Sequence, residues 1–534
     1  MNDVEHDKKR NRIALLMSDA LDRVIHNPAA SYCWLNLVSV TDAWVRRGYD
    51  SGQLRQWLDR LRAAVPANDI AGFHWAMYQH YVTQEPGFLK SASALLLTIV
   101  PADLDRMAAF FNFAWQITLA RSSQRAVFVS ALQEIGLPLL TQCMGQMVAR
   151  QARCLPPVRP IERIQKVAIV AAFLFSKDSP PTMMALEQAQ LARQNGMQVG
   201  LFSCQEAQVP DYANLLGNGF GVNQDSYQID TLIRELGLEL TVAVNEPRFS
   251  LMRRALDMLE KISAFDPDLV LVVGLHSCLA QALYAVRPVL ALGVNSIASM
   301  LPADVWLAAR ADAGNHPWGA RMPASQPWHH PWRLSRKSLL ANLSRAELGL
   351  PEDALVLISS AWCLPITVAP EWLDAMAAFL RQHPQVVWVL LRSDDGLAAS
   401  LQHLPDGQLH LLPGTDNVMG VLACCDIYVN PPRMGGGFAV ADAMAAGLPA
   451  LCFADSDGGD KLGSAGPLAH DLGDYFSLLQ QWVRDPALRL ELGARMRQQF
   501  DQQLDLAHAG PSVLGAGQAA LSRFQARTGA AVEA

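Results

Sequence analysis

The residues that could carry chemistry gather at one point of the sequence, a glycine-rich turn between a strand and a helix. Three consecutive glycines at 435–437 follow an apolar run at 425–429, which is typical of a buried parallel strand, and they open a helix predicted to run to about 446. Such a turn exposes backbone N–H groups at the positive end of a helix dipole, where a diphosphate binds well. One turn into the helix, Asp442 is placed to accept hydrogen bonds from ribose hydroxyls. The stretch therefore predicts a nucleotide-sugar site.

Positively charged side chains near this turn are predicted to complete the diphosphate site. Arg433 stands just before the glycines, Lys461 follows the next strand, and Arg392 ends a strand at the same edge of the sheet. Ligands of α/β folds bind at that edge, and cations there would stabilise a leaving diphosphate. The structural alternatives are solvent-exposed side chains for Arg433 and Lys461 and an ion pair for Arg392. The predicted donor-binding residues are Arg392, Arg433, Gly435, Gly436, Gly437, Phe438, Asp442 and Lys461.

Two residues are candidates for a catalytic base on the acceptor side. His276 follows a strand predicted at 269–273, and a histidine there could take a proton from an acceptor hydroxyl or polarise the sugar. Asp178 lies in the loop after the strand predicted at 166–173. A satisfied core side chain is the structural alternative for His276. The sequence has no Asp-x-Asp triplet at a strand end, so no obligatory metal cofactor is expected.

The stretch from 425 to 453 resembles the donor-binding segment of GT-B glycosyltransferases. In that family the segment reads as a strand, a proline, a glycine-rich turn, an acidic residue in an EAMA-G-P motif and a second strand; here the region reads NPPRMGGGFAVADAMAAGLP. Retaining members of the family carry two glutamates in this segment. The present chain has Met434 at the first of these positions and Asp442 at the second. The resemblance therefore implies binding of a nucleotide sugar more directly than it implies retaining chemistry.

A second run, ALYAVRPVLALG at 282–293, is similar to a segment shared by O-GlcNAc transferases and bacterial cytoplasmic protein N-glycosyltransferases. The latter also carry an all-α domain before the GT-B domains and a single Asp in their donor segment. The chain departs from them in the loop at 361–367, where they place a lysine, and at 435–437, where they have an asparagine-rich turn. The single acidic residue and the RPVLALG run favour inverting chemistry, whereas AMAAGLP at 443–449 resembles the retaining families, so the stereochemical outcome stays open.

The resemblance implies a glycosyltransferase that needs no cofactor besides its donor substrate. It would move a hexose or an N-acetylhexosamine from a nucleotide diphosphate sugar, with UDP as the expected nucleotide, to a protein side chain or a surface glycan. Met434 and the missing lysine at 361–367 motivate an alternative, a catalytically inactive GT-B adaptor subunit that binds and supports an active glycosyltransferase. An epimerase or a phosphorylase is a weaker alternative, because no phosphate-specific basic cluster or pyridoxal-lysine motif is evident.

The elements that must position these residues change in type along the chain. Helical periodicity dominates the first part, and a proline-rich linker at 154–160 precedes strands and helices that alternate as in doubly wound domains. A segment at 314–333, rich in Pro, Trp and His, is predicted to link two such domains and to form a wall of the cleft. The fold class is therefore α/β: a GT-B pair of Rossmann-like domains that face each other across a cleft, preceded by an all-α domain. The predicted units are an all-α domain at 1–155 for acceptor docking or structure, an acceptor-side Rossmann-like domain at 163–335, a nucleotide-sugar-binding domain at 341–500, and a C-terminal helix and tail at 501–534.

Composition fits a globular protein of two or three domains. Of 534 residues, 51% are hydrophobic and 17% charged, and the net charge of −7 comes without a long basic run, so no nucleic-acid partner is expected. The nine cysteines show no paired C-x-x-C spacing, which indicates neither a zinc site nor a disulfide framework and favours a reducing cytoplasm. The polar start lacks the apolar core of a signal peptide. A peripheral contact with a membrane and a homo-oligomeric state are left open.

Overall fold

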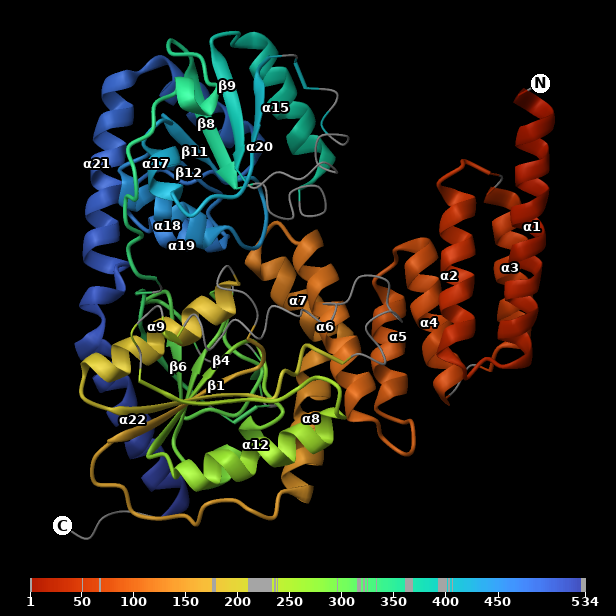
Figure 1. Ribbon diagram of the computed structural model, residues 1–534, viewed down its shortest axis with the longest axis horizontal. Helices are drawn as coiled ribbons and strands as arrows, with labels where there is room; N and C mark the ends of the chain where they lie inside the picture. Colours follow the sequence, from red (N-terminus) through yellow and green to blue (C-terminus); the bar gives the residue numbers. More distant parts are fainter. Residues whose placement is uncertain are drawn as a thin grey trace.

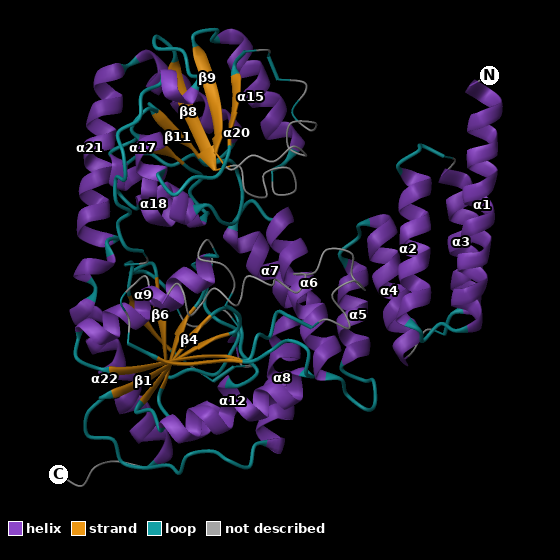
Figure 2. Cartoon of the chain, viewed as in Figure 1, coloured by secondary structure: helices purple, strands orange, loops and turns teal. Residues whose placement is uncertain are grey.

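A helical part and two α/β domains follow one another along the chain (Figure 1). Each domain holds one sheet with helices on its faces (Figure 2). The computed structural model describes residues 2–49, 51–66, 69–174, 179–209, 233–234, 237, 239–294, 296–314, 318–319, 322–323, 325–332, 334–360, 368–391, 401, 404–405 and 407–529. Asp178, Arg392 and the loop at 361–367 lie outside these residues.

The helical part packs as two groups. Its helices are α1 (Asn2–His26), α2 (Ser31–Val45), α3 (Ser51–Ala64), α4 (Asp69–Thr83), α5 (Gly87–Leu96), α6 (Leu104–Arg121), α7 (Arg125–Ile135) and α8 (Leu137–Gln151). Helices α1 to α4 form a bundle with its own core around Trp34 and Trp44, and α4 joins this bundle to the rest of the molecule by packing against α5 (Figure 1). Helices α5 to α8 share the core of the first α/β domain, because α6 is apolar on nearly all sides and buries Phe110 and Phe111 there. Among the described helices, none is long and apolar enough by itself to cross a membrane; α7 and α8 reach that length only together, across a bend of 56°.

The first α/β domain is built on a parallel sheet. Its elements are β1 (Lys166–Ala171), α9 (Pro180–Gln194), β2 (Gln198–Ser203), β3 (Thr241–Val244), α12 (Leu251–Phe265), β4 (Leu269–Val273), α13 (Ala280–Val286), β5 (Val289–Leu292), β6 (Val305–Ala308) and β7 (Gln326–His329). The strand order is β3-β2-β1-β4-β5-β6-β7. The central strands are apolar and buried on both faces, which is why the sequence pattern predicted β1 and β4 well.

One expectation for this domain is wrong. The range 314–333 was expected to be a linker, but its part Gln326–His329 pairs in parallel with β6 and forms the edge strand β7. Its proline and its partly exposed side chains suit an edge position, where one side of the strand needs no ladder hydrogen bonds. A strand of this composition has neither the apolar run nor the alternation that identifies a strand from sequence.

The second α/β domain repeats the doubly wound plan with a smaller parallel sheet. Its elements are β8 (Leu355–Ser360), α15 (Pro370–Gln382), β9 (Val386–Leu391), β10 (Leu409–Leu412), α17 (Val418–Leu422), β11 (Ile427–Val429), α18 (Gly437–Ala446), β12 (Ala450–Leu451), α19 (Asp457–Leu462) and α20 (Leu472–Arg484), after a short 3-10 helix, η3 (Ala346–Leu348). The strand order is β10-β9-β8-β11-β12. The strands predicted at 354–360, 386–392 and 408–412 are β8, β9 and β10, close to their predicted bounds.

The end of the chain returns to the first domain. Helix α21 (Pro486–Gln503) runs beside the second domain, and after η4 (Leu506–His508) the helix α22 (Gly510–Thr528) packs against β5 and β6 (Figure 1). Arg527 near its end forms an ion pair with Asp304, at 2.7 Å, and its guanidinium lies 3.7 Å from the ring centre of Tyr284. The last helices therefore tie the two domains together on the side away from the helical part.

Both sheets reverse their strand order beside their first strand. The reversal lies between β1 and β4 in the first sheet and between β8 and β11 in the second. Ligands of α/β sheets bind in the crevice beyond the carboxyl ends of the strands at such a point. His276 follows β4 and the glycine-rich turn follows β11, so the two parts of the site predicted from sequence lie at these crevices.

Candidate functional site

The glycine-rich turn has a backbone that only glycine adopts easily. Gly435 and Gly436 have φ values of 117° and 78°, and α18 begins at Gly437. A Cβ atom on Gly436 would lie 2.6 Å from Oδ1 of Asn430, so the turn is also too crowded for a side chain there. The chain thus passes from β11 into α18 in the tight form that brings backbone N–H groups to the helix start.

A carboxylate of the protein already lies at this helix start. The N–H group of Gly437 donates to Oδ2 of Asp457, at 3.2 Å, and the hydroxyl of Ser296 donates to Oδ1, at 2.5 Å. Nζ of Lys461 lies 3.3 Å from the same Oδ1. Burial acts to raise the pKa of Asp457, but the charge of Lys461 and the hydrogen bond from Ser296 outweigh it and lower that pKa below its ordinary value. The position where a phosphate is expected therefore already binds an anionic oxygen.

The two described cations of the predicted site are buried. Arg433 is 5% exposed, and its Nη2 donates to the carbonyl of Ser360 at the end of β8, at 3.3 Å. Lys461 is 4% exposed and, besides its contact with Asp457, donates to the hydroxyl of Ser296, at 3.3 Å. Neither is the solvated side chain that was the structural alternative. Phe438, the other predicted neighbour, packs against the cores of both α/β domains.

Asp442 is buried on α18 and pairs with a lysine that sequence reasoning missed. Nζ of Lys337, in the segment between the domains, lies 2.6 Å from Oδ2 of Asp442. Burial raises the pKa of Asp442, and the charge of Lys337 opposes that rise. A carboxylate with one partner still has lone pairs for ribose hydroxyls. No sequence pattern marked Lys337, because it is 105 positions from Asp442.

Glu187 of the first domain completes this group. It lies on α9, is 6% exposed, and accepts a hydrogen bond from the N–H group of Ser335, at 2.7 Å. Burial raises the pKa of Glu187 to about 8, with the hydrogen bond from Ser335 acting against the rise. The charges of Asp442 and Lys337 both act on it. Glu187, Lys337 and Asp442 thus connect the first domain, the interdomain segment and the second domain.

His276 is buried under the helical part. It is 3% exposed, its ring centre lies 3.9 Å from that of Phe111 on α6, and its Nε2 lies 3.4 Å from Oε2 of Glu206. Burial lowers the pKa of His276 to about 3, so its imidazole is neutral at physiological pH. The hydroxyl of Ser299 donates to the carbonyl of Gly274 in the same loop, which links this loop to the segment that carries Ser296. Among the described residues, His276 contacts Phe111 and Glu206 and does not reach the glycine-rich turn.

The helical part also contacts the turn directly. The N–H group of Met434 donates to the carbonyl of Ser122, between α6 and α7, at 3.0 Å. Arg125 at the start of α7 pairs with Asp460 of α19, at 2.5 Å, and its N–H group donates to the carbonyl of Asp455, at 2.9 Å. Figure 1 shows the N-terminal end of α7 beside the second domain. The turn that follows β11 is therefore covered by residues from the helical part and from the first domain.

Comparison by sequence finds no relative: no protein-family model matches the chain, and no curated protein matches it significantly. Comparison of structures finds many. A mutant of the O-GlcNAc transferase from Thermobaculum terrenum matches 97% of this chain and 98% of its own, at 14% identity and a TM-score of 0.53. A sucrose-phosphate synthase from Thermosynechococcus elongatus matches 68% of this chain and all of its own, at 14% identity and a TM-score of 0.44. The first similarity extends over the helical and the α/β parts alike, and this chain therefore has the GT-B fold preceded by a helical part, as its sequence predicted.

Proposed function

We propose that this protein is a glycosyltransferase whose donor is a nucleotide diphosphate sugar. The observation that carries the proposal is the glycine-rich turn at the point where the second sheet reverses its order, with two buried cations, Arg433 and Lys461, beside it. Lys461 is already paired with Asp457, and a diphosphate would bring two or more further negative charges to these buried cations. The GT-B fold supports the same function.

In the proposed reaction the protein stabilises the leaving diphosphate. The N–H groups at the start of α18, with Arg433 and Lys461, would bind its oxygens as charge develops on them. Asp442 would accept hydrogen bonds from the ribose, in exchange for part of its contact with Lys337. The proposed donor carries UDP and a hexose or an N-acetylhexosamine, and no metal ion is required. The bond from the sugar to the diphosphate breaks as the bond from the sugar to the acceptor oxygen or nitrogen forms.

The acceptor is proposed to be a protein side chain or a surface glycan, bound between the helical part and the first domain in the cytoplasm. A base must take the acceptor proton in that reaction. His276 and Asp178 are the two residues proposed from the sequence. Burial lowers the pKa of His276 to about 3, which makes it a weak base, and its Nε2 faces Glu206. Asp178 lies outside the described residues.

Donor binding requires that contacts across the domain boundary exchange. Met434, Asp442 and Asp457 are all less than 8% exposed. Ser296 bonds to Asp457 from the first domain, and Arg125 bonds to Asp460 from the helical part. A GT-B enzyme that separates its domains to admit the donor would break these bonds first. The exposed fraction of the site would then rise before binding.

The experiment that tests the proposed function is a turnover assay with a broad panel of nucleotide sugars. Release of free nucleotide from one of them, alone or with a peptide or glycan acceptor, is the expected result. If no nucleotide sugar is bound or consumed across UDP-, GDP-, ADP- and CMP-linked donors, the proposal fails.

Replacing Asp457 with asparagine is expected to tighten UDP binding. The substitution removes a negative charge next to the proposed diphosphate position and releases Lys461 from its ion pair, while the amide oxygen can still accept from Gly437. Removing repulsion between charges a few ångströms apart is worth about 1 kcal/mol even where water screens them fully, so Kd is expected to fall at least about fivefold. Isothermal titration calorimetry with UDP measures it, and Asp353→Asn in an exposed turn is the control with the same change of net charge. Weaker binding by the Asp457 variant would mean that Asp457 supports the donor instead of competing with it.

A second candidate function is the inactive GT-B adaptor subunit. Two observations favour it. The carboxylate of Asp457, from α19, accepts a hydrogen bond at the start of α18. Met434, which stands where the retaining GT-B enzymes carry a glutamate, is buried against the core of the first domain. Such a protein would be recovered together with an active glycosyltransferase and would turn over no nucleotide sugar alone. Activity of the purified chain by itself would exclude this function.

A further inference from the structure

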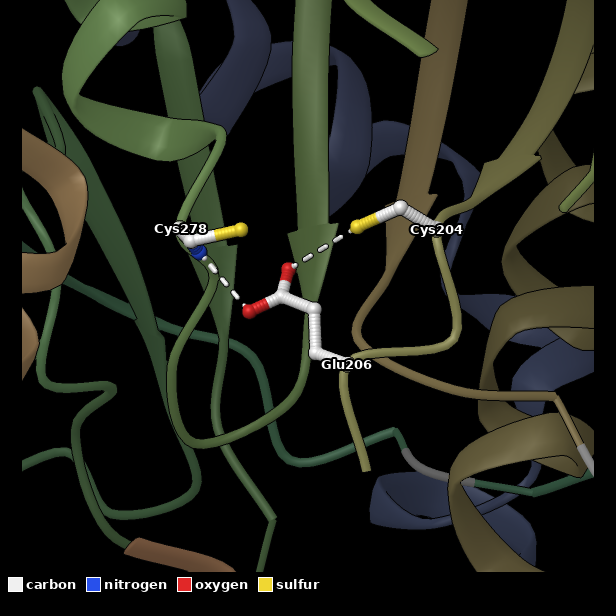
Figure 3. Close-up of side chains that lie close together, drawn as sticks. All are labelled: Cys204, Glu206 and Cys278. Carbon is white, nitrogen blue, oxygen red and sulfur yellow. Dashed lines mark hydrogen bonds between the residues drawn. The ribbon is translucent and has the colours of Figure 1, made fainter. Parts of the chain in front are cut away.

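Two cysteines and a glutamate converge in the first domain, at the carboxyl ends of its central strands. Cys204 and Glu206 lie in the loop after β2, and Cys278 lies in the loop after β4 (Figure 3). One ligand atom of each, the two Sγ atoms and a carboxylate oxygen, lie within 4.8 Å of one another. In a tetrahedral zinc site the ligand atoms are about 3.3–3.8 Å apart, given bond lengths of about 2.0–2.3 Å. The three side chains therefore need to move by only about an ångström to share one ion.

His276, in the loop after β4, lies beside this group but outside the set of ligand atoms that lie within 4.8 Å of one another. Its Nε2 lies 3.4 Å from Oε2 of Glu206, and among the described residues this buried nitrogen has no hydrogen-bond partner. Two thiolates and one carboxylate leave the fourth position of a tetrahedral zinc ion open, and the ring of His276 would have to shift toward the thiols to fill it.

The loop that carries Cys204 and Glu206 is held firmly in place. Arg254 of α12 is 1% exposed, and its guanidinium donates to the carbonyls of Cys204, at 2.6 Å, and Gln208, at 2.8 Å. The carboxylate of Glu206 is oriented by the hydroxyl of Ser277 and by the N–H group of Cys278, both at 2.8 Å. Such partners around a ligand fix its direction and are a general feature of metal sites.

The group is buried, so an ion bound there would be shielded from water. Cys204, Glu206 and Cys278 are each no more than 1% exposed. A zinc ion would displace three protons, one from each group, and leave a complex with a net charge of about −1. The guanidinium of Arg254, bonded to the backbone of the same loop, offsets that remaining charge.

We propose that Cys204, Cys278, Glu206 and His276 bind one zinc ion, which ties the loop after β2 to the loop after β4 beneath α6. The cysteine spacing in the sequence did not indicate this site because its ligands come from two loops and form no C-x-x-C pair. Zinc-bound His276 cannot also accept a proton from the acceptor, so the base of the proposed reaction is then Asp178 or another residue. The zinc site itself does not depend on the proposed function.

The test is the zinc content of the untagged full-length protein, purified with ZnCl2 in the growth medium and then dialysed against metal-free buffer. About one zinc per chain is expected for the wild type, and for Cys33→Ser, which removes a buried cysteine of the α1–α4 bundle. The double variant Cys204→Ser/Cys278→Ser is expected to hold none. His276→Gln is expected to weaken zinc binding by at least tenfold while both thiolates remain.

A second measurement on the wild type alone covers the case in which the double variant does not fold. Replacing zinc by CoCl2 is expected to give the visible bands of tetrahedral cobalt and the near-ultraviolet band of thiolate bonded to cobalt. A wild-type protein that takes up neither metal overturns the proposal. So does a disulfide between Cys204 and Cys278 in a peptide map of protein kept from air, because oxidised sulfur cannot bind the ion.

Discussion

Replacing Asp442 with asparagine is expected to weaken UDP binding by about tenfold to a hundredfold. The side chain keeps its size and its oxygen acceptor but loses the charge that strengthens hydrogen bonds from the ribose hydroxyls, and charged hydrogen bonds are worth about 1.5–3 kcal/mol. The measurement is isothermal titration calorimetry of wild type and variant at the same pH and salt concentration. Asp353→Asn in an exposed turn is the matched control, because it makes the same change of net charge and should change the affinity by less than about threefold.

A UDP analogue without ribose hydroxyls tests whether Asp442 contacts the ribose directly. Wild-type protein should bind 2′,3′-dideoxy-UDP as weakly as the Asp442 variant binds UDP, and the variant should lose little more affinity for the dideoxy compound. Equal affinities of the variant and the wild type for UDP would place the ribose elsewhere. An equal loss for UDP and for its dideoxy analogue would mean that the substitution disturbs the turn, not a contact with the ribose.

Replacing Glu187 with glutamine is expected to remove a large part of the pH dependence of stability. Burial raises the pKa of Glu187 from an ordinary value of 4.5 to about 8. Between these two pH values the folded protein keeps a proton that the unfolded chain has lost, so the free energy of unfolding falls as pH rises, by up to about 1.4 kcal/mol per pH unit. The stability that comes from this group is therefore fully present below pH 4.5 and is lost as pH rises toward 8. Glutamine does not titrate and keeps an oxygen for the N–H group of Ser335.

Chemical denaturation at pH 5, 6, 7 and 8 measures this effect. Relative to the wild type, the Glu187→Gln variant should gain about 2–4 kcal/mol between pH 5 and pH 8. The control is Glu239→Gln, which changes a side chain that is 91% exposed and should leave the pH profile unchanged. If the free energy of unfolding changes with pH in the same way in the wild type and the variant, Glu187 is ionised in the folded protein. Glu187 would then not be the neutral neighbour of Lys337 and Asp442.

The sequence predicted best what is local and strongly patterned. The apolar runs at 269–273 and 386–391 are strands, because a strand inside a parallel sheet is buried on both faces and its consecutive residues are therefore all apolar. The turn at 435–437 was recognised because the whole segment from 425 to 453, with its strand, glycines, helix and second strand, resembles a known donor-binding segment, and Gly435 and Gly436 do adopt positive φ values. By contrast, β3 and β7 lie at sheet edges, where partly exposed side chains remove the pattern.

The contacts that define the candidate site could not be predicted in the same way. Gly437 and Asp457 meet through different loops, and Ser296 reaches Asp457 from the other domain, 161 positions away. The pairing of Lys337 with Asp442 likewise depends on how the interdomain segment passes α18. No periodicity records such contacts, because they arise only when separate loops, or the two domains, pack against each other. The only local signal was Asp457 itself, four positions before Lys461 on one face of α19.

The same limit explains the buried cysteines. Cys204 and Cys278 are 74 positions apart in the sequence, in loops that follow β2 and β4 on either side of β1. Parallel strands bring their carboxyl ends to one edge of the sheet, so residues after them meet in space. A search of the sequence for closely spaced cysteines does not detect pairs of this kind.

Amide hydrogen exchange of the wild-type protein, with and without UDP, GDP and their sugars, tests the central claim most directly. The claim is that the turn after β11 and the start of α18 bind a nucleotide diphosphate sugar. With one nucleotide, exchange is expected to slow in peptides that cover 433–442 and 457–461 and to change little in the α1–α4 bundle. If no nucleotide slows exchange at the turn, or if the slowing lies elsewhere while the turn is unchanged, the protein does not bind its donor there and the proposed function is wrong.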